Sequence, residues 1–184
     1  MLRILVGLAF IPMTLLAFSA FGEEEVFRHL DVSDGNHEGH WIMFFSKAMA
    51  ANAPMGTVGV AVGKGDSFEG AFGMIVKSSK PTLGAATEEE IKALRDDEKA
   101  PAATITLIDV SPEQYAAAKE AVDVYSAREE HVDRQTDVAM NFAFDVFKNL
   151  PLKRPYRSGL GGANVIIYYS DIGLLNRKLA KTDS

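Results

Sequence analysis

An apolar segment at the N-terminus decides which part of this 184-residue chain has to fold in water. Arg3 stands in front of an uninterrupted apolar run over residues 4–18, and small residues follow at Ser19, Ala20 and Gly22. A basic start, an apolar stretch and small residues before the cleavage point are the order typical of a secretory signal peptide. We therefore expect residues 1–22 to direct export and residues 23–184 to form a single secreted or periplasmic domain.

The same segment has a second interpretation, as a membrane anchor that is not removed. The apolar run is shorter than the roughly 20 residues that a membrane-spanning helix prefers, and Pro12 lies inside it. A cleaved signal peptide therefore fits the sequence better. An uncleaved anchor would still hold the domain outside the cytoplasm.

The part of the chain after residue 22 has to be stabilised by packing, because the sequence contains no cysteine. An exported protein without disulfides depends on its hydrophobic core, and a chain of this length is large enough to bury one. The absence of thiols also excludes thiolate zinc sites and cysteine nucleophiles. The formal net charge of −6 repels a phosphate backbone, so nucleic acid is not an expected partner.

Residue patterns along the chain predict strands and helices in an irregular order. β-Branched and apolar runs predict strands at 26–32, 57–63, 68–76, 104–110 and 165–169, the second and third of them as an antiparallel pair. Residues 40–51 fit either a strand or a helix. Helices are predicted at 88–97, 111–130 and 136–150, and a short amphipathic tail at 172–179. This order favours an α+β fold, with an antiparallel sheet packed against a few helices.

The three predicted helices begin at residues that cap helices well. Thr87 with Glu90 forms one capping-box pattern, and Ser111 with Gln114 forms another. The third helix begins near Thr136, whose hydroxyl can cap it. Along this third helix apolar residues recur at every fourth position, at Val138, Phe142, Val146 and Leu150.

The second half of the chain carries a succession of motifs that points to one enzyme family. A predicted strand ends in Ile108-Asp109-Val110, and a helix opens directly after it with Ser111-Pro112-Glu113-Gln114-Tyr115. The next helix opens with Thr136-Asp137-Val138 and is followed by Leu150-Pro151-Leu152-Lys153-Arg154-Pro155. This succession resembles the circularly permuted papain-like amide hydrolases of the NlpC type. The resemblance implies a permuted papain-like architecture, with the nucleophilic cysteine at the position of Val138 and the catalytic histidine at the position of Thr57.

Both catalytic positions implied by this resemblance hold other residues here. Val138 has no nucleophilic atom, and Thr57 does not act as a general base at neutral pH. The resemblance therefore implies an exported, non-catalytic relative of cell-envelope hydrolases. In that case a cleft between Thr57 and Val138 would bind a cell-envelope component or another protein.

A series of acidic and histidine residues near the start of the predicted domain supports a second hypothesis. Asp31, Asp34, His37 and His40 stand three positions apart. Such side chains suit a divalent first-row metal if the loop brings them together, so a metal-dependent hydrolase with Asp34, His37 and His40 as ligands is possible. Turn residues at 33–36 argue against a helix that would align them, and a solvated loop is the competing interpretation.

The remaining hypotheses rest on weaker patterns. A serine could replace the cysteine, with His131 as base and one of three serines as nucleophile, Ser126, Ser158 or Ser170, but none lies in a Gly-x-Ser-x-Gly elbow. Residues 159–162 are glycine-rich but precede a predicted strand, so we expect a loop and not a phosphate site. A structural or inhibitory partner protein, which would expose an apolar patch, is the last alternative.

Export predicts a shortened protein. When the full chain is expressed in a bacterium, the protein recovered from the periplasm or medium should begin at Ala20, Phe21 or Glu23, as measured by intact mass and N-terminal sequencing. Replacing Leu5 and Leu8 with Arg should keep the full-length chain in the cytoplasm, because the apolar stretch is interrupted. An extracytoplasmic fraction that contains only full-length protein would favour the anchor instead.

Overall fold

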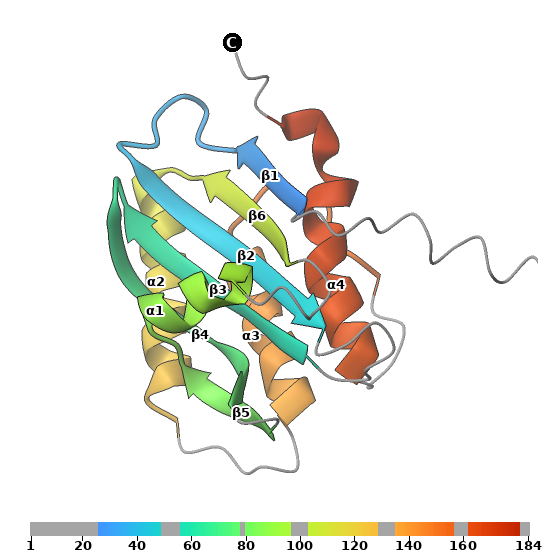
Figure 1. Ribbon diagram of the computed structural model, residues 1–184. Helices are drawn as coiled ribbons and strands as arrows, with labels where there is room; N and C mark the ends of the chain where they lie inside the picture. The colour runs from blue at the N-terminus through green and yellow to red at the C-terminus, as the bar shows by residue number, and fades with distance from the viewer. Residues whose placement is uncertain are drawn as a thin grey trace, which may run out of the picture.

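The structure, a computed structural model, describes residues 26–48, 56–77, 80–96, 103–128, 135–156 and 162–180. Within these residues six strands form one sheet in the order β1-β6-β2-β3-β4-β5 (Figure 1). The predicted signal peptide lies outside the described residues.

The sheet is mixed but mostly antiparallel. Its strands are β1 (Val26–Asp31), β2 (His40–Ala48), β3 (Gly56–Lys64), β4 (Ser67–Lys77), β5 (Lys80–Ala85) and β6 (Thr104–Asp109). β1 pairs with β6 in parallel, and the other neighbouring pairs are antiparallel. The expected antiparallel pair is confirmed as β3 and β4, and the undecided segment that starts at residue 40 is a strand.

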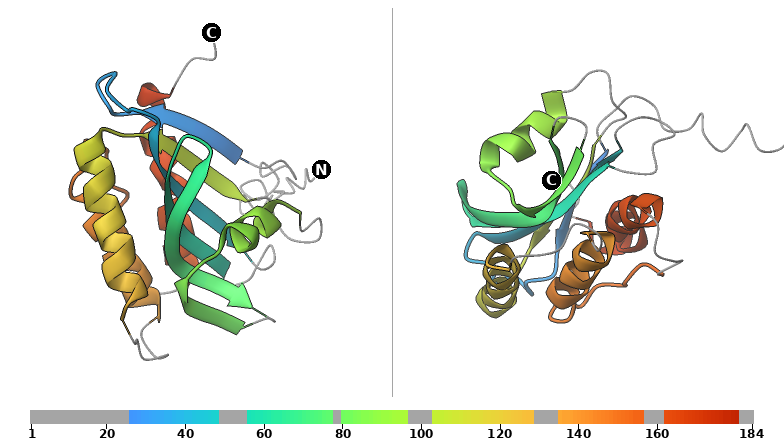
Figure 2. Two further views of the ribbon diagram at one scale, coloured as in Figure 1. Left: turned by 90° about the vertical axis from the view of Figure 1, so that its left-hand side faces the viewer. Right: turned by 90° about the horizontal axis from the view of Figure 1, so that it is seen from below.

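Helices cover the two faces of the sheet unequally (Figure 2). One face, called here the helical face, carries α2 (Pro112–Ser126), α3 (Gln135–Phe147) and α4 (Gly162–Leu175). The other, called here the α1 face, carries the short α1 (Glu88–Asp96). After α4 comes the 3-10 turn η2 (Arg177–Leu179), and Ala180 then bridges Leu30 of β1. The α+β prediction is confirmed, and none of the helices in the described ranges is long and apolar enough to cross a membrane.

The central strand β3 shows how the sequence creates the two faces. All its residues from Gly56 to Gly63 are buried. Its valines, at positions 58, 60 and 62, belong to the core cluster that includes α2, α3 and α4, whereas Ala61 belongs to the cluster that includes Ile91 of α1. Successive side chains of a strand point to opposite faces. The valines therefore supply the helical face, and small residues supply the α1 face.

The small residues of the α1 face make room for aromatic rings that lie on β3. A Cβ atom on Gly59 would stand 2.5 Å from the Phe45 ring, and one on Gly63 would stand 2.1 Å from the Trp41 ring. The register of β2 and β3 pairs Phe45 with Gly59 and Trp41 with Gly63. The Phe45 and Trp41 rings of β2 thus cover β3 at Gly59 and Gly63 on the α1 face.

Both predicted capping boxes are present. At the start of α1, the backbone N–H of Glu90 donates to Thr87 Oγ1 (3.2 Å), and that of Thr87 donates to the Glu90 carboxylate (3.0 Å). At the start of α2, the N–H of Ser111 donates to Gln114 Oε1 (2.8 Å), and that of Gln114 donates to Ser111 Oγ (3.3 Å). These bonds satisfy N–H groups that a helix start leaves without an intrahelical partner.

The predicted strand at 165–169 is wrong, because these residues lie inside α4. The buried hydrophobic residues of this helix follow the three- and four-residue spacing of one helical face, with Val165 three and four positions before Tyr168 and Tyr169, and Ile172 four and three positions after them. β-Branched and aromatic residues prefer strands locally, but burying one helical stripe on the sheet outweighs that preference. Because α4 begins at Gly162, the glycine-rich residues precede a helix and not a strand; positions 159–161 lie outside the described residues.

Strand β5 is the element that the sequence pattern does not indicate. It contains Pro81 and Gly84, which both weaken a strand prediction. β5 lies at the edge of the sheet and pairs only with β4 in the strand order. A proline is tolerated in an edge strand because one side of that strand makes no ladder hydrogen bonds.

The contact between Gly59 and the Phe45 ring predicts that adding one methyl group at position 59 destabilises the protein. Gly59→Ala should lower the free energy of unfolding by about 1–3 kcal/mol, because the new Cβ would also stand 2.7 Å from the carbonyl oxygen of Phe72. Gly84→Ala is the matched control, since no atom lies within 4 Å of its Cβ position. Urea unfolding of both variants measures the difference, and equal stability of the two would contradict the packing described for β3.

Candidate functional site

The two positions implied by the family resemblance do not face each other. Val138 of α3 is buried in the same core cluster as Val58, on the helical face. Thr57 precedes Val58 in β3, so its side chain points to the α1 face. Its Oγ1 accepts a hydrogen bond from the backbone N–H of Val76 (3.1 Å). A nucleophile and a base at these two positions would lie on opposite sides of the sheet.

The structure does not gather the predicted metal ligands. Asp34 lies in a turn with φ of 52°, and His37 lies in the loop that follows. His40 begins β2 with its ring against Tyr115 of α2, the ring centroids 4.5 Å apart. Across the described ranges, no group of three or more His, Asp or Glu side chains is placed to hold a metal ion.

Tyr115, the aromatic partner of His40, is held as a neutral hydroxyl. Burial, together with a hydrogen bond to the Glu69 carboxylate, raises the pKa of Tyr115 above its ordinary range. The side chain of His40 therefore packs against an uncharged ring on the helical face.

The serine hypothesis is only partly covered by the described residues. His131 and Ser158 lie outside them, and Ser126 is exposed at the end of α2. Ser170 of α4 donates its hydroxyl hydrogen to the carbonyl oxygen of Ile166 (2.9 Å), and its Oγ lies 2.7 Å from Ser46 Oγ. These bonds fix Ser170 between α4 and the sheet.

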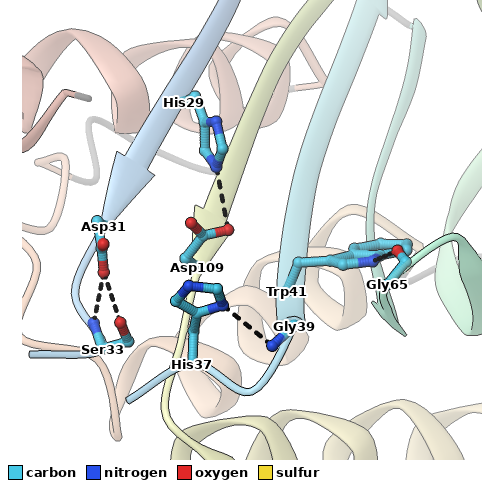
Figure 3. A network of polar contacts seen from close by, with 8 residues as sticks. All are labelled: His29, Asp31, Ser33, His37, Gly39, Trp41, Gly65 and Asp109. Carbon is cyan, nitrogen blue, oxygen red and sulfur yellow. Dashed lines mark hydrogen bonds and ion pairs between the residues drawn. The ribbon is translucent and has the colours of Figure 1, made fainter. Parts of the chain in front are cut away.

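A polar group that the sequence patterns did not bring together lies where β1 and β6 end, and it includes Asp31 and His37 of the acidic and histidine series (Figure 3). These strands are parallel, and their last residues, Asp31 and Asp109, are register partners. His29 Nε2 lies 3.0 Å from Asp109 Oδ1. Asp31 accepts hydrogen bonds from the backbone N–H (3.0 Å) and hydroxyl (2.6 Å) of Ser33. Polar side chains at the carboxyl ends of adjacent parallel strands are a common arrangement of ligand sites.

The loop from β1 to β2 arches over the end of β6, because β6 lies between these two strands. The N–H of Val32 donates to the carbonyl oxygen of Asp109 (3.0 Å), and the N–H of Val110 donates to that of His40 (3.2 Å). Within the loop, the N–H of Gly39 donates to His37 Nδ1 (3.0 Å). His37 is thus carried across the strand end that bears Asp109 (Figure 3).

Trp41 completes the group on the α1 face. It stands directly opposite Asp109 in the antiparallel pair of β2 and β6. Its indole Nε1–H donates to the carbonyl oxygen of Gly65 in the turn between β3 and β4 (2.9 Å). That turn is tied to the loop as well, since the N–H of Gly65 donates to the carbonyl oxygen of Gly39 (2.8 Å). We call His29, Asp31, His37, Trp41 and Asp109 the sheet-end site.

Exposure divides the sheet-end site into a centre and a rim. Asp109 is the buried centre, with a side chain that is 11 % exposed, whereas the side chain of His29 is 32 % exposed. Asp31, His37 and Trp41 are also half-buried. Sequence reasoning missed His29 because it grouped residues by nearness in the chain, while the partner of His29 is 80 positions away. The usable signal was an aspartate at the second-last position of two predicted strands, Asp31 in 26–32 and Asp109 in 104–110.

Comparison with known proteins assigns no family to the chain. No family model matches it, and the curated proteins and the solved structures give no significant match. The geometry of the site therefore has to carry the functional conclusion.

The hydrogen bonds of three histidines predict their neutral tautomers. His29 faces a carboxylate, so its proton lies on Nε2, whereas His37 Nδ1 accepts from Gly39, so its proton also lies on Nε2. His40 Nδ1 lies 3.0 Å from the carbonyl oxygen of His37, so its proton should lie on Nδ1. Long-range ¹H–¹⁵N NMR spectra of the neutral side chains measure this difference. An Nε2–H tautomer at His40 would contradict the loop geometry.

Proposed function

We propose that the chain is an exported, non-catalytic protein that binds a component of the cell envelope. Two features support the absence of papain-type catalysis. Val138 is apolar and buried, and the Thr57 hydroxyl accepts a hydrogen bond from Val76 on the opposite face of the sheet. The resemblance to NlpC-type hydrolases does not carry the proposal, because the two positions that it implies lie on opposite faces of the sheet.

The observation that carries the binding function is the construction of the sheet-end site. Half-buried polar and aromatic side chains lie around the buried Asp109, at one end of a sheet face that also carries an apolar core cluster. Hydrogen bonds from Ser33, Gly39 and Gly65 hold the members of the site or the loop that carries them. A few oriented polar groups beside apolar surface are typical of ligand-binding sites.

One observation supports the alternative of an unconventional hydrolase. A partly exposed imidazole hydrogen-bonded to a buried carboxylate, as in His29 and Asp109, is the arrangement of a general base with its orienting group. A water molecule would have to act as the nucleophile, because the Ser33 hydroxyl hydrogen is donated to Asp31. This alternative predicts that substrate is cleaved and that His29→Ala abolishes cleavage.

A second alternative, a structural or inhibitory partner protein, is supported by apolar side chains on the outer surface of α4 and just after it. These exposed residues are Ile167, Leu174, Leu175 and Leu179. Exposed apolar residues that lie close together mark protein interaction surfaces. This alternative predicts a stable protein complex that does not depend on the sheet-end site.

The proposed function predicts binding without cleavage. The exported protein should co-sediment with purified peptidoglycan or with envelope vesicles, and Asp109→Ala should reduce the bound fraction at least fivefold because it removes the centre of the site. Glu120→Ala, which removes an exposed carboxylate on α2, is the matched control and should bind as the unaltered protein does. Thermal unfolding shows whether each variant is folded. Failure to bind any envelope fraction would reject the proposal.

The products of the same incubation distinguish binding from hydrolysis. Chromatography of the supernatant should show no released sugars or peptides. The double variant Thr57→His with Val138→Cys should also release none, because the two side chains lie on opposite faces of the sheet. Cleavage by the unaltered protein would show that it is an enzyme, and cleavage gained by the double variant would show that the two positions do converge.

A further inference from the structure

The Trp41 side chain is fixed in an orientation that exposes part of a flat ring. The ring lies on Gly63, where any side chain would collide with it, and its Nε1–H is bonded to Gly65. The register of β3 and β4 shifts between Val62 and Gly63, directly beneath the ring. Bulges of this kind are frequent next to functional sites, where they redirect side chains. A ring held in place before binding loses little conformational entropy when a ligand stacks on it.

The polar side chains beside this ring offer both hydrogen-bond donors and acceptors. Asp109 and Trp41 are direct cross-strand partners, and Cβ atoms at such positions are about 5 Å apart. The carboxylates of Asp109 and Asp31 are acceptors. His37 presents a donor, because its Nδ1 already accepts from Gly39 and its proton lies on Nε2.

This combination discriminates between classes of ligand. An anion would be repelled by two carboxylates on a chain of net charge −6. An ammonium group would pair with the carboxylates and the indole but would leave the His37 donor without an acceptor. A hydroxyl group both donates and accepts, so neighbouring hydroxyls on one molecule can donate to the carboxylates and accept from the imidazole together.

A sugar ring also fits the exposed part of Trp41. One side of a pyranose ring presents C–H groups, whose hydrogens carry a small positive charge. The face of an aromatic ring is the negative part of its quadrupole and attracts such groups. We propose that the sheet-end site binds an uncharged saccharide, which stacks on Trp41 and is hydrogen-bonded by Asp109, Asp31 and His37. The inference rests on the proposed binding function and adds the chemical class of the ligand.

The single tryptophan of the sequence makes the test specific. Chitotetraose, cellotetraose and maltotetraose are titrated into the exported protein while its fluorescence is recorded, because a sugar on Trp41 changes the emission of that one residue. At least one oligosaccharide should give a saturable change. Calorimetric titration should show at least tenfold weaker binding for Trp41→Ala and for Asp109→Asn, and a smaller loss for Trp41→Phe, which keeps a ring. Tyr156→Ala, which removes a 91 % exposed aromatic residue outside the site, should bind normally.

Three results would overturn the inference. The first is the absence of binding by all three oligosaccharides, and the second is binding that Trp41→Ala and Trp41→Phe both leave unchanged. The third is binding of envelope fractions that 0.5 M salt abolishes, as expected for a charged ligand. If envelope fractions still bind through Asp109 in any of these cases, the proposed function stands and only the ligand class is wrong. If envelope fractions do not bind at all, the proposed function itself fails.

Discussion

The burial of β3 from Gly56 to Gly63 is the constraint on which the rest of the structure depends. A strand that is buried on both sides needs cover on both faces, and the sequence supplies two different kinds. The valines 58, 60 and 62 pack under α2, α3 and α4, whereas Gly59 and Gly63 receive the rings of Phe45 and Trp41. One layer is made of helices and the other, in this region, of side chains from the neighbouring strand. That thinner cover leaves the Trp41 end of the α1 face within reach of solvent.

Local sequence signals predict most of the elements because those elements depend on local chemistry. The capping boxes at Thr87 and Ser111 and the alternation in β3 are each complete within a few residues. The prediction at 165–169 failed because five residues show a strand-like composition, while the helical spacing that decides the structure needs the longer span to Ile172. β5 was not predicted, because a strand with Pro81 and Gly84 is tolerated at the edge of a sheet. Whether a strand lies at the edge is decided by the assembled fold and cannot be read from a few residues.

The candidate site could not be found in the same way, because it is a product of topology. Asp31, Asp34, His37 and His40 are close in the chain, yet His40 turns to the helical face and packs on Tyr115. The partner of His29 is instead Asp109, which the parallel pairing of β1 and β6 brings to the same end of the sheet. The separation of Thr57 from Val138 also depends on the assembled sheet. Val58 points to the same face as Val138, whereas Thr57, one residue earlier in β3, points to the opposite face.

The parallel contact of β1 with β6 also has a consequence for how the molecule is assembled. Within the described residues, the first strand to be synthesised pairs with the last one, so β1 remains without this neighbour until Thr104 and the residues after it have been made. Contacts between such distant segments form late, because closing a long stretch of chain costs entropy before any pairing is gained. His29 and Asp109 meet only at that step. Their hydrogen bond therefore distinguishes the finished protein from partly folded forms, and a ligand that binds there selectively stabilises the former.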